Sequence, residues 1–175
     1  SGRHSSVVDM ARTLADVAAV VGQVDAVIAH SAGGAATTLA VNGGLTVRRI
    51  AYVAPALRPG GFLRRVLRRL RLDVRLIREA ERWMEQRVGT TFADLHRGVA
   101  EPADVPLLVV HDEDDRVVPV AEGRALAERW PGARLEVTAG LGHARVLADG
   151  AVVRSVVHFV AGTLPCDGGP GSRRD

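Results

Sequence analysis

The sequence predicts an α/β fold, in which a parallel sheet carries helices on both faces. Short apolar runs rich in β-branched residues, typical of buried strands, alternate with longer segments that repeat apolar residues at helical spacing. Such alternation is typical of a parallel sheet that is covered on both sides. A chain of 175 residues is also long enough to form one domain with its own hydrophobic core.

The first half of the chain contains two of the predicted strands. We expect a helix over residues 5–22, because its apolar residues recur at helical spacing. The apolar, β-branched run at 24–30 predicts a buried strand, and the small residues at 32–43 suit a helix. A second strand is predicted over 47–54, where Pro55 closes it.

An Arg-rich segment at residues 59–97 separates the second predicted strand from the third. Its apolar residues recur near helical spacing, and Arg occupies most of the positions between them. The segment predicts one long broken helix or two helices, with a further short helix that begins near Thr91. We expect this insertion, at about residues 58–100, to form a helical cap on the core.

The second half of the chain repeats the alternation of strands and helices. In chain order, the pattern predicts a strand over 105–111, a helix over 119–130, a strand over 133–138 and a helix over 148–161. Residues 1–165 then form the core with its cap. The final residues, 166–175, are rich in Gly, Pro and charge, which predicts a disordered tail.

The composition limits the classes of function. The net charge is +3, but all 23 basic residues are Arg, which indicates a compositional bias along the whole chain. The charge alone therefore does not indicate a nucleic-acid partner. No apolar run approaches the roughly 18 residues of a membrane span. The single Cys166 excludes an internal disulfide and a Cys-based metal site, and we expect a cytoplasmic location.

The residues AHSAGG, after the first predicted strand, leave two alternatives for Ser31. A Ser before a Gly-rich helix start commonly caps that helix. Alternatively, Ser31 is a nucleophile held at a sharp turn, which crowds the residues two positions away on each side. Ala29 and Gly33 are small enough for such a turn, and the pattern matches the G-x-S-x-G nucleophile elbow with Ala29 in place of the first Gly. This turn aims the backbone N–H of Ala32 at a developing oxyanion.

Four acidic residues follow the third predicted strand, in the segment HDEDDRVVP at 111–119. They are Asp112, Glu113, Asp114 and Asp115. The cluster is either a solvated acidic turn, a weak site for a hard cation, or a loop in which one acid turns inward to orient a His. The spacing matches no strong metal site, so we expect no bound metal.

His143 follows the fourth predicted strand, in the segment AGLGHARVL. Ligands of parallel sheets bind beyond the carboxyl ends of the strands, so the three loops aim their side chains at one common site. Ser, then acid, then His along the chain is the order of the triad in α/β hydrolases. Of the other histidines, His30 is expected to support the turn at Ser31, and His111 to be structural.

On these motifs the sequence resembles the carboxyl-terminal part of a protein with the α/β-hydrolase fold. AHSAGG resembles the nucleophile elbow, PLLVVHDEDDRVVP resembles the acid-bearing strand and loop, and GLGH resembles the loop of the catalytic His. The resemblance makes Asp115 the catalytic acid and puts Asp112 where the family usually has Gly. It implies hydrolysis of an ester, thioester or amide through an acyl-enzyme on Ser31, with His143 as the base and no cofactor.

The resemblance also implies that strands preceding residue 24 in the family are missing here. The strand at 24–30 then has a bare apolar edge, so we expect the isolated chain to fold poorly or to self-associate. The leading interpretation is a serine hydrolase that acts on a small-molecule acyl substrate. The alternative is a truncated or non-catalytic protein of the same fold that acts by binding, through its Arg-rich cap.

The Arg-rich cap itself has two interpretations. It is either a surface for an anionic partner, such as nucleic acid, an acyl-carrier protein, a coenzyme A thioester or a lipid headgroup, or an amphipathic lid. We favour the lid, because no nucleic-acid motif accompanies the Arg residues. The apolar side of the lid is then expected to line the acyl pocket with Leu63, Leu67, Leu70, Trp83 and Met84.

Overall fold

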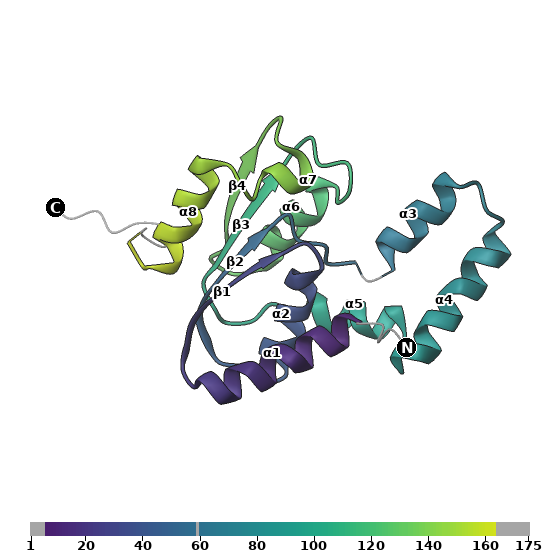
Figure 1. Ribbon diagram of the computed structural model, residues 1–175, viewed down its shortest axis with the longest axis horizontal. Coiled ribbons are helices and arrows are strands. Elements are labelled where there is room, and N and C mark those ends of the chain that lie inside the picture. Colours follow the sequence, from purple (N-terminus) through teal and green to yellow (C-terminus); the bar gives the residue numbers. More distant parts are fainter. Residues whose placement is uncertain (1–5, 59, 164–175) are drawn as a thin grey trace.

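The computed structural model describes residues 6–58 and 60–163, and its centre is a four-stranded parallel sheet (Figure 1). The predicted parallel sheet is confirmed, and each strand begins and ends within two residues of the predicted bounds. In register, Ala29 lies beside Tyr52, and Tyr52 lies beside Val109. In spatial order the strands are β1 (Val24–His30), β2 (Val47–Val53), β3 (Leu107–Asp112) and β4 (Arg134–Thr138).

Helices cover both faces of the sheet, because β2 and β3 are apolar on both sides. On one face, Ile50, Tyr52 and Val109 pack in a core with residues of α2 (Ala32–Asn42), α5 (Phe92–Ala100) and α6 (Val120–Arg129). On the other face, Val53 and Val110 pack against α8 (Gly150–Val160). Alternate residues of one strand therefore stabilise opposite layers.

Helix α1 (Val7–Val21) packs against α2 through small residues. Ala11 of α1 lies in one buried cluster with Ala36 and Ala40 of α2. At the start of α1, Ser6 and Asp9 form a capping box, in which each side chain bonds the backbone N–H of the other residue. The predicted helix over 5–22 is thus confirmed in its described part.

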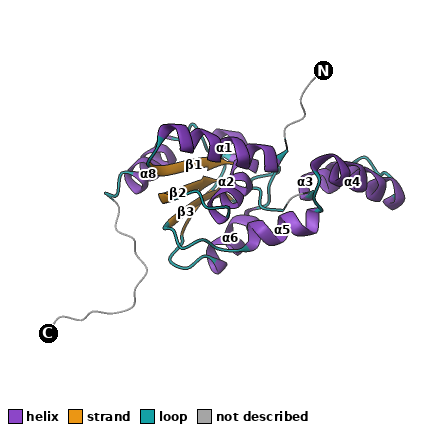
Figure 2. Cartoon of the chain, turned by 90° about the horizontal axis from the view of Figure 1, so that it is seen from below, coloured by secondary structure: helices purple, strands orange, loops and turns teal. Residues whose placement is uncertain are grey.

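Three helices are inserted between β2 and β3. They are α3 (Gly61–Arg69), α4 (Val74–Val88) and α5, which agrees with two helices followed by a short one near Thr91. α5 packs against α2, and the Asn42 side chain of α2 donates a hydrogen bond to the carbonyl of Gly98. α3 and α4 extend away from the sheet in both views (Figures 1 and 2).

Two features complete the fold. A one-turn helix, α7 (Gly142–Arg145), carries His143, where the sequence pattern predicts only a loop.

In the part of the chain that the structure describes, β1 pairs only with β2. The same part contains no helix that is long and apolar enough to cross a bilayer. The predicted tail at 166–175, with Cys166, lies outside the described residues.

Candidate active site

Ser31 lies at a strained turn between β1 and α2. Its φ of 53° and ψ of −123° place a non-glycine residue in a region that L-residues rarely adopt. The backbone N–H of Ser31 donates to Val53, and its carbonyl accepts from Gly34 and Ala56. The Ser31 side chain makes no capping hydrogen bond to α2, so the cap interpretation is wrong. The hydroxyl instead lies 3.1 Å from a ring nitrogen of His143.

The residues around this turn are small because there is no room for larger ones. Ala29 is buried, and a Cβ atom added to Gly33 would lie 3.5 Å from the Ala29 Cβ. A Cβ added to Gly34 would lie only 3.1 Å from the Cβ of Pro55, which is tighter than nearly all real contacts. The small residues on both sides of Ser31 therefore match the crowding expected at a sharp strand-to-helix turn.

A continuous line of hydrogen bonds joins Ser31, His143 and Asp115. The Asp115 carboxylate accepts a bond from His143 Nδ1 at 2.7 Å, and His143 Nε2 lies 3.1 Å from Ser31 Oγ. Because a carboxylate can only accept, the proton of the neutral imidazole is on Nδ1. The Nε2 lone pair then faces the Ser31 hydroxyl. The structure thus brings together three residues that lie far apart in the sequence.

Asp115 is held as a carboxylate. Burial by itself raises the pKa of this group, but three hydrogen bonds favour the ionised form and lower the pKa below its usual value. The donors are the backbone N–H groups of Val118 and Val117, each 2.8 Å from Oδ1, and His143 on Oδ2. Asp115 therefore carries a negative charge behind the imidazole at neutral pH.

Asp112 is a second buried carboxylate, and it holds the segment that carries His143. Its oxygens accept from the backbone N–H groups of Leu141 and Gly142, at 3.1 and 2.8 Å, and from the Thr138 hydroxyl at 2.7 Å. A fourth bond comes from the Asp114 N–H at 3.0 Å. Burial raises the pKa of Asp112, but these bonds outweigh it and lower the pKa. Of the four acidic residues, Glu113 and Asp114 are exposed, as a solvated turn would have them, whereas Asp112 and Asp115 are buried.

His30 supports His143 from the other side. Its Nε2 donates to the backbone carbonyl of His143 at 3.0 Å, and the two ring centroids lie 4.6 Å apart. Burial is the largest influence on His30 and lowers its pKa, so the ring is neutral near pH 7.

His111 is fully buried behind Asp115. Its Nε2 donates to the carbonyl of Val118 at 3.0 Å and lies 3.4 Å from Asp115 Oδ2. Within the described residues, the other ring nitrogen, Nδ1, has no hydrogen-bond partner and faces Gly123. The same residues contain no group of three or more His, Cys, Asp or Glu side chains that could hold a metal ion.

The backbone N–H of Ala32 begins α2, directly after Ser31. The first N–H groups of a helix have no partner within the helix, and the helix dipole makes this end attractive to a negative charge. The hydroxyl of Ser31 and the first turn of α2 thus adjoin one another.

The residues expected to line an acyl pocket are spread over α3, the turn after it and α4. Leu70 and Trp83 are 65% and 55% exposed, and Arg87 lies over the Trp83 ring. Leu67 and Met84 are partly buried, and the side chain of Leu63 lies outside the described residues. An acyl-binding role for these five residues stays a prediction.

The sequence matches the model of the alpha/beta hydrolase family over residues 1–155. The chain belongs to this family. Membership supports hydrolase activity in general, and the fold, with its parallel sheet and flanking helices, is that of the family. No protein among the curated ones matches the sequence.

Solved structures of the family share the fold at low sequence identity. The monoacylglycerol lipase of Paleococcus ferrophilus is 18% identical with a TM-score of 0.65, and the match covers 92% of this chain and 77% of that one. An esterase from Exiguobacterium antarcticum is 14% identical with a TM-score of 0.59, covering 89% and 74%. A bromoperoxidase from Bacillus anthracis is 11% identical with a TM-score of 0.58, covering 87% and 72%.

Two supporting residues were not assigned their contacts from the sequence. The sequence marks Asp112 only as a departure from the Gly that is usual in the family, and that departure is the signal that could have identified it. His30 was expected to support the turn at Ser31, whereas its hydrogen bond is to His143. Both residues bond the backbone at or next to His143.

Proposed function

We propose that this protein is a serine hydrolase that cleaves an ester, thioester or amide of a small molecule. The observation that carries the proposal is the line of hydrogen bonds from Asp115 through His143 to a strained Ser31 whose hydroxyl caps nothing. A structural serine gains nothing from a backbone conformation that costs on the order of 1–3 kcal/mol. The strain is expected where it exposes a nucleophile.

The reaction has two halves. Ser31 Oγ attacks the carbonyl carbon while its proton moves to His143 Nε2, and the oxygen of the tetrahedral intermediate becomes an anion. The N–H of Ala32 stabilises this oxyanion. His143 then gives the proton to the departing alcohol, thiol or amine, which leaves an acyl-enzyme on Ser31. A water molecule, deprotonated by His143, hydrolyses the acyl-enzyme by the same steps and restores the hydroxyl.

Asp115 and His30 contribute through His143. The ionised Asp115 keeps the proton on Nδ1 and stabilises the imidazolium that forms when Nε2 accepts the serine proton. His30 holds the backbone of His143 through the carbonyl hydrogen bond. Neither residue exchanges a proton with the substrate.

The test compares Ser31→Ala with Ser155→Ala, using p-nitrophenyl butyrate as the substrate. Ser155 lies on α8, outside the site, and its hydroxyl bonds Glu136. We expect Ser31→Ala to lower kcat by at least about 10⁴-fold while circular dichroism stays unchanged. Ser155→Ala keeps its activity. Hydrolysis at the wild-type rate by purified Ser31→Ala would contradict the proposal.

A further inference from the structure

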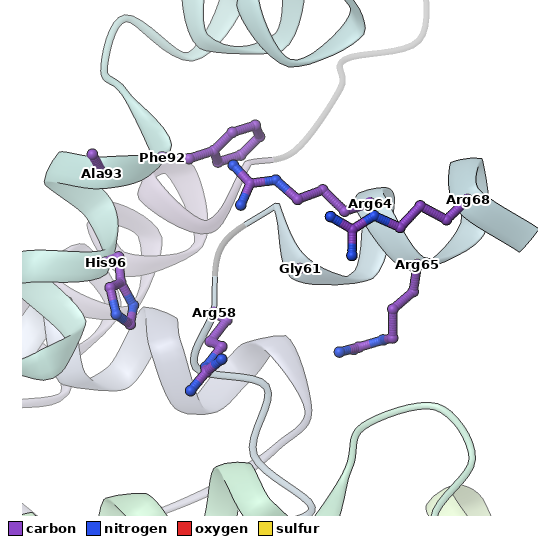
Figure 3. A pocket seen from close by; sticks show the side chains of 8 residues that line it. All are labelled: Arg58, Gly61, Arg64, Arg65, Arg68, Phe92, Ala93 and His96. Carbon is purple, nitrogen blue, oxygen red and sulfur yellow. The ribbon is translucent and has the colours of Figure 1, made fainter. Parts of the chain in front are cut away.

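A cavity of about 570 Å³ lies between α3 and α5, and four arginines line it (Figure 3). Its volume is within the range of pockets that bind small organic ligands. Phe92, Ala93 and His96 of α5 form the opposite wall. No lining residue is acidic, and the full set is Arg58, Gly61, Arg64, Arg65, Arg68, Phe92, Ala93 and His96.

The positive charge of this cavity is only partly neutralised. Arg64 pairs with Glu81, and Arg65 pairs with Glu122 at 3.3 Å. Within residues 6–58 and 60–163, neither Arg58 nor Arg68 has an ion pair. A bias toward Arg explains why the chain has many arginines. It does not explain why four of them surround one hollow with no acid in its lining.

The cavity wall is attached to the candidate active site. The N–H of Ala56 donates to the carbonyl of Ser31 at 3.0 Å, and Arg58 follows Ala56 by two residues. Two residues span at most about 7 Å of chain, so Arg58 begins close to the nucleophile turn. Between them, the N–H of Leu57 donates to the buried Glu122. The cavity is therefore joined to the turn at Ser31 through the chain, although none of Ser31, Asp115 and His143 lines it.

The entrance to α3 is built tightly against α5. Gly60 has a φ of 77°, and a Cβ there would lie 3.0 Å from the Phe92 ring. On the other side, the Phe92 N–H donates to the Glu85 side chain of α4 at 2.8 Å. These contacts fix Phe92, and the turn before α3 packs directly on it. The segment that follows Arg58 is thus packed against Phe92 at Gly60, which joins the two walls of the cavity.

We propose that this cavity binds a phosphate-bearing part of the substrate, so that the preferred acyl compounds are phosphorylated thioesters or esters. The inference rests on the proposed hydrolase function. The planar guanidinium group bonds phosphate through two parallel N–H groups. Of the four arginines that line the cavity, Arg58 and Arg68 have no carboxylate partner among the described residues. A concave site formed by two elements suits a small molecule better than a flat membrane surface.

The kinetic test uses two substrates that share the acyl group and the thioester bond. Butyryl-coenzyme A carries phosphates, whereas the butyryl thioester of N-acetylcysteamine carries none. We expect the ratio of the two kcat/KM values to fall at least about tenfold in the double variant Arg58→Gln/Arg68→Gln. The control, Arg75→Gln/Arg78→Gln, removes the same charge from exposed positions on α4 and leaves the ratio unchanged. An equal fall in both double variants would overturn the proposal.

A binding measurement separates this inference from the proposed chemistry. Coenzyme A, inorganic phosphate and anionic phospholipid vesicles are each titrated into Ser31→Ala by calorimetry, with and without the Arg58→Gln/Arg68→Gln change. Binding of coenzyme A that weakens at least about tenfold with this change supports the site, even if no thioester is hydrolysed. Binding of phosphate alone or of vesicles alone would overturn it, as would the absence of any binding.

Discussion

The carboxylate of Asp112 accepts a hydrogen bond at 2.8 Å from the backbone N–H of Gly142, the residue directly before His143. Together with the bond from Leu141, this contact fixes the start of α7 to the end of β3. The imidazole of His143 is therefore positioned by one acid at its backbone and by another, Asp115, at its ring.

Replacement of Asp112 by Asn tests this arrangement. The amide keeps only one acceptor oxygen, so the variant loses either the bonds from Gly142 and Asp114 to one oxygen or those from Leu141 and Thr138 to the other. We expect Asp112→Asn to lower kcat about tenfold or more with little change in KM. The imidazole of His143 is unchanged in this variant, but its backbone is less firmly positioned. Glu113→Gln removes the same charge from an exposed neighbour, and steady-state kinetics with this variant should match wild type. Equal kcat values for Asp112→Asn and Glu113→Gln would contradict the positioning role.

The pH dependence of stability tests the environment of His30. Its pKa is lowered in the folded state, so on acidification the unfolded chain binds the proton first, near the ordinary value of about 6.5. The free energy of unfolding should therefore fall as the pH decreases through this range. His30→Gln keeps an N–H donor for the His143 carbonyl but cannot titrate. Urea unfolding at several pH values between 5 and 7.5 measures the free energy of unfolding. This free energy should depend less steeply on pH in the variant than in wild type, and equal pH dependence would contradict a lowered pKa of His30.

Because Gly123 has no side chain, the His111 ring has room to lie behind Asp115. A Cβ on Gly123 would lie 2.6 Å from His111 Nδ1, so Gly123→Ala must displace the ring. We expect a loss of about 1–3 kcal/mol of stability by overpacking, and a fall in kcat because His111 contacts the loop of Asp115. Gly150→Ala is the control, since its added Cβ meets only the flexible end of Arg154. Thermal unfolding and kinetics of both variants measure the difference.

The outer edge of β1 predicts self-association. Among the described residues this edge has no strand partner, and the Ile28 side chain on β1 is 55% exposed. An apolar edge of this kind pairs with other chains, and a charge on it opposes the pairing. The 175-residue chain should elute above its monomer mass of 18.5 kDa, and Ile28→Lys should shift it toward the monomer. Val20→Lys, on the exposed side of α1, is the matched control.

A result in which the wild-type chain elutes as a monomer at all concentrations would contradict this expectation. A shift caused equally by Val20→Lys and Ile28→Lys would indicate a general effect of charge. Only the difference between the two variants reports on the strand edge.

The strands and the longer helices could be predicted from the sequence because their signals are local. The run at 24–30 is apolar at most positions, and its bounds as a strand are those of β1. The four residues of α7 carry too little periodicity to be recognised, although they include His143. The fold class thus followed from repeated patterns, and the shortest element did not.

The candidate site was predictable in its members but not in its supports. Asp112, Glu113, Asp114 and Asp115 are alike in the sequence, and two of them are buried. Asp115 accepts from the neighbouring Val117 and Val118 and from the distant His143, whereas Asp112 accepts from the β4–α7 connection. Such choices depend on which loops the sheet brings together, which no local pattern records.

The most direct test of the account is the reaction of the purified chain with a fluorophosphonate probe, which labels a serine only when that serine is activated. The label is located by mass spectrometry, and circular dichroism of the same sample reports the fold. We expect a folded chain labelled on Ser31, with labelling abolished in His143→Ala and retained in Ser155→Ala. A folded chain that carries no label on Ser31 would contradict it.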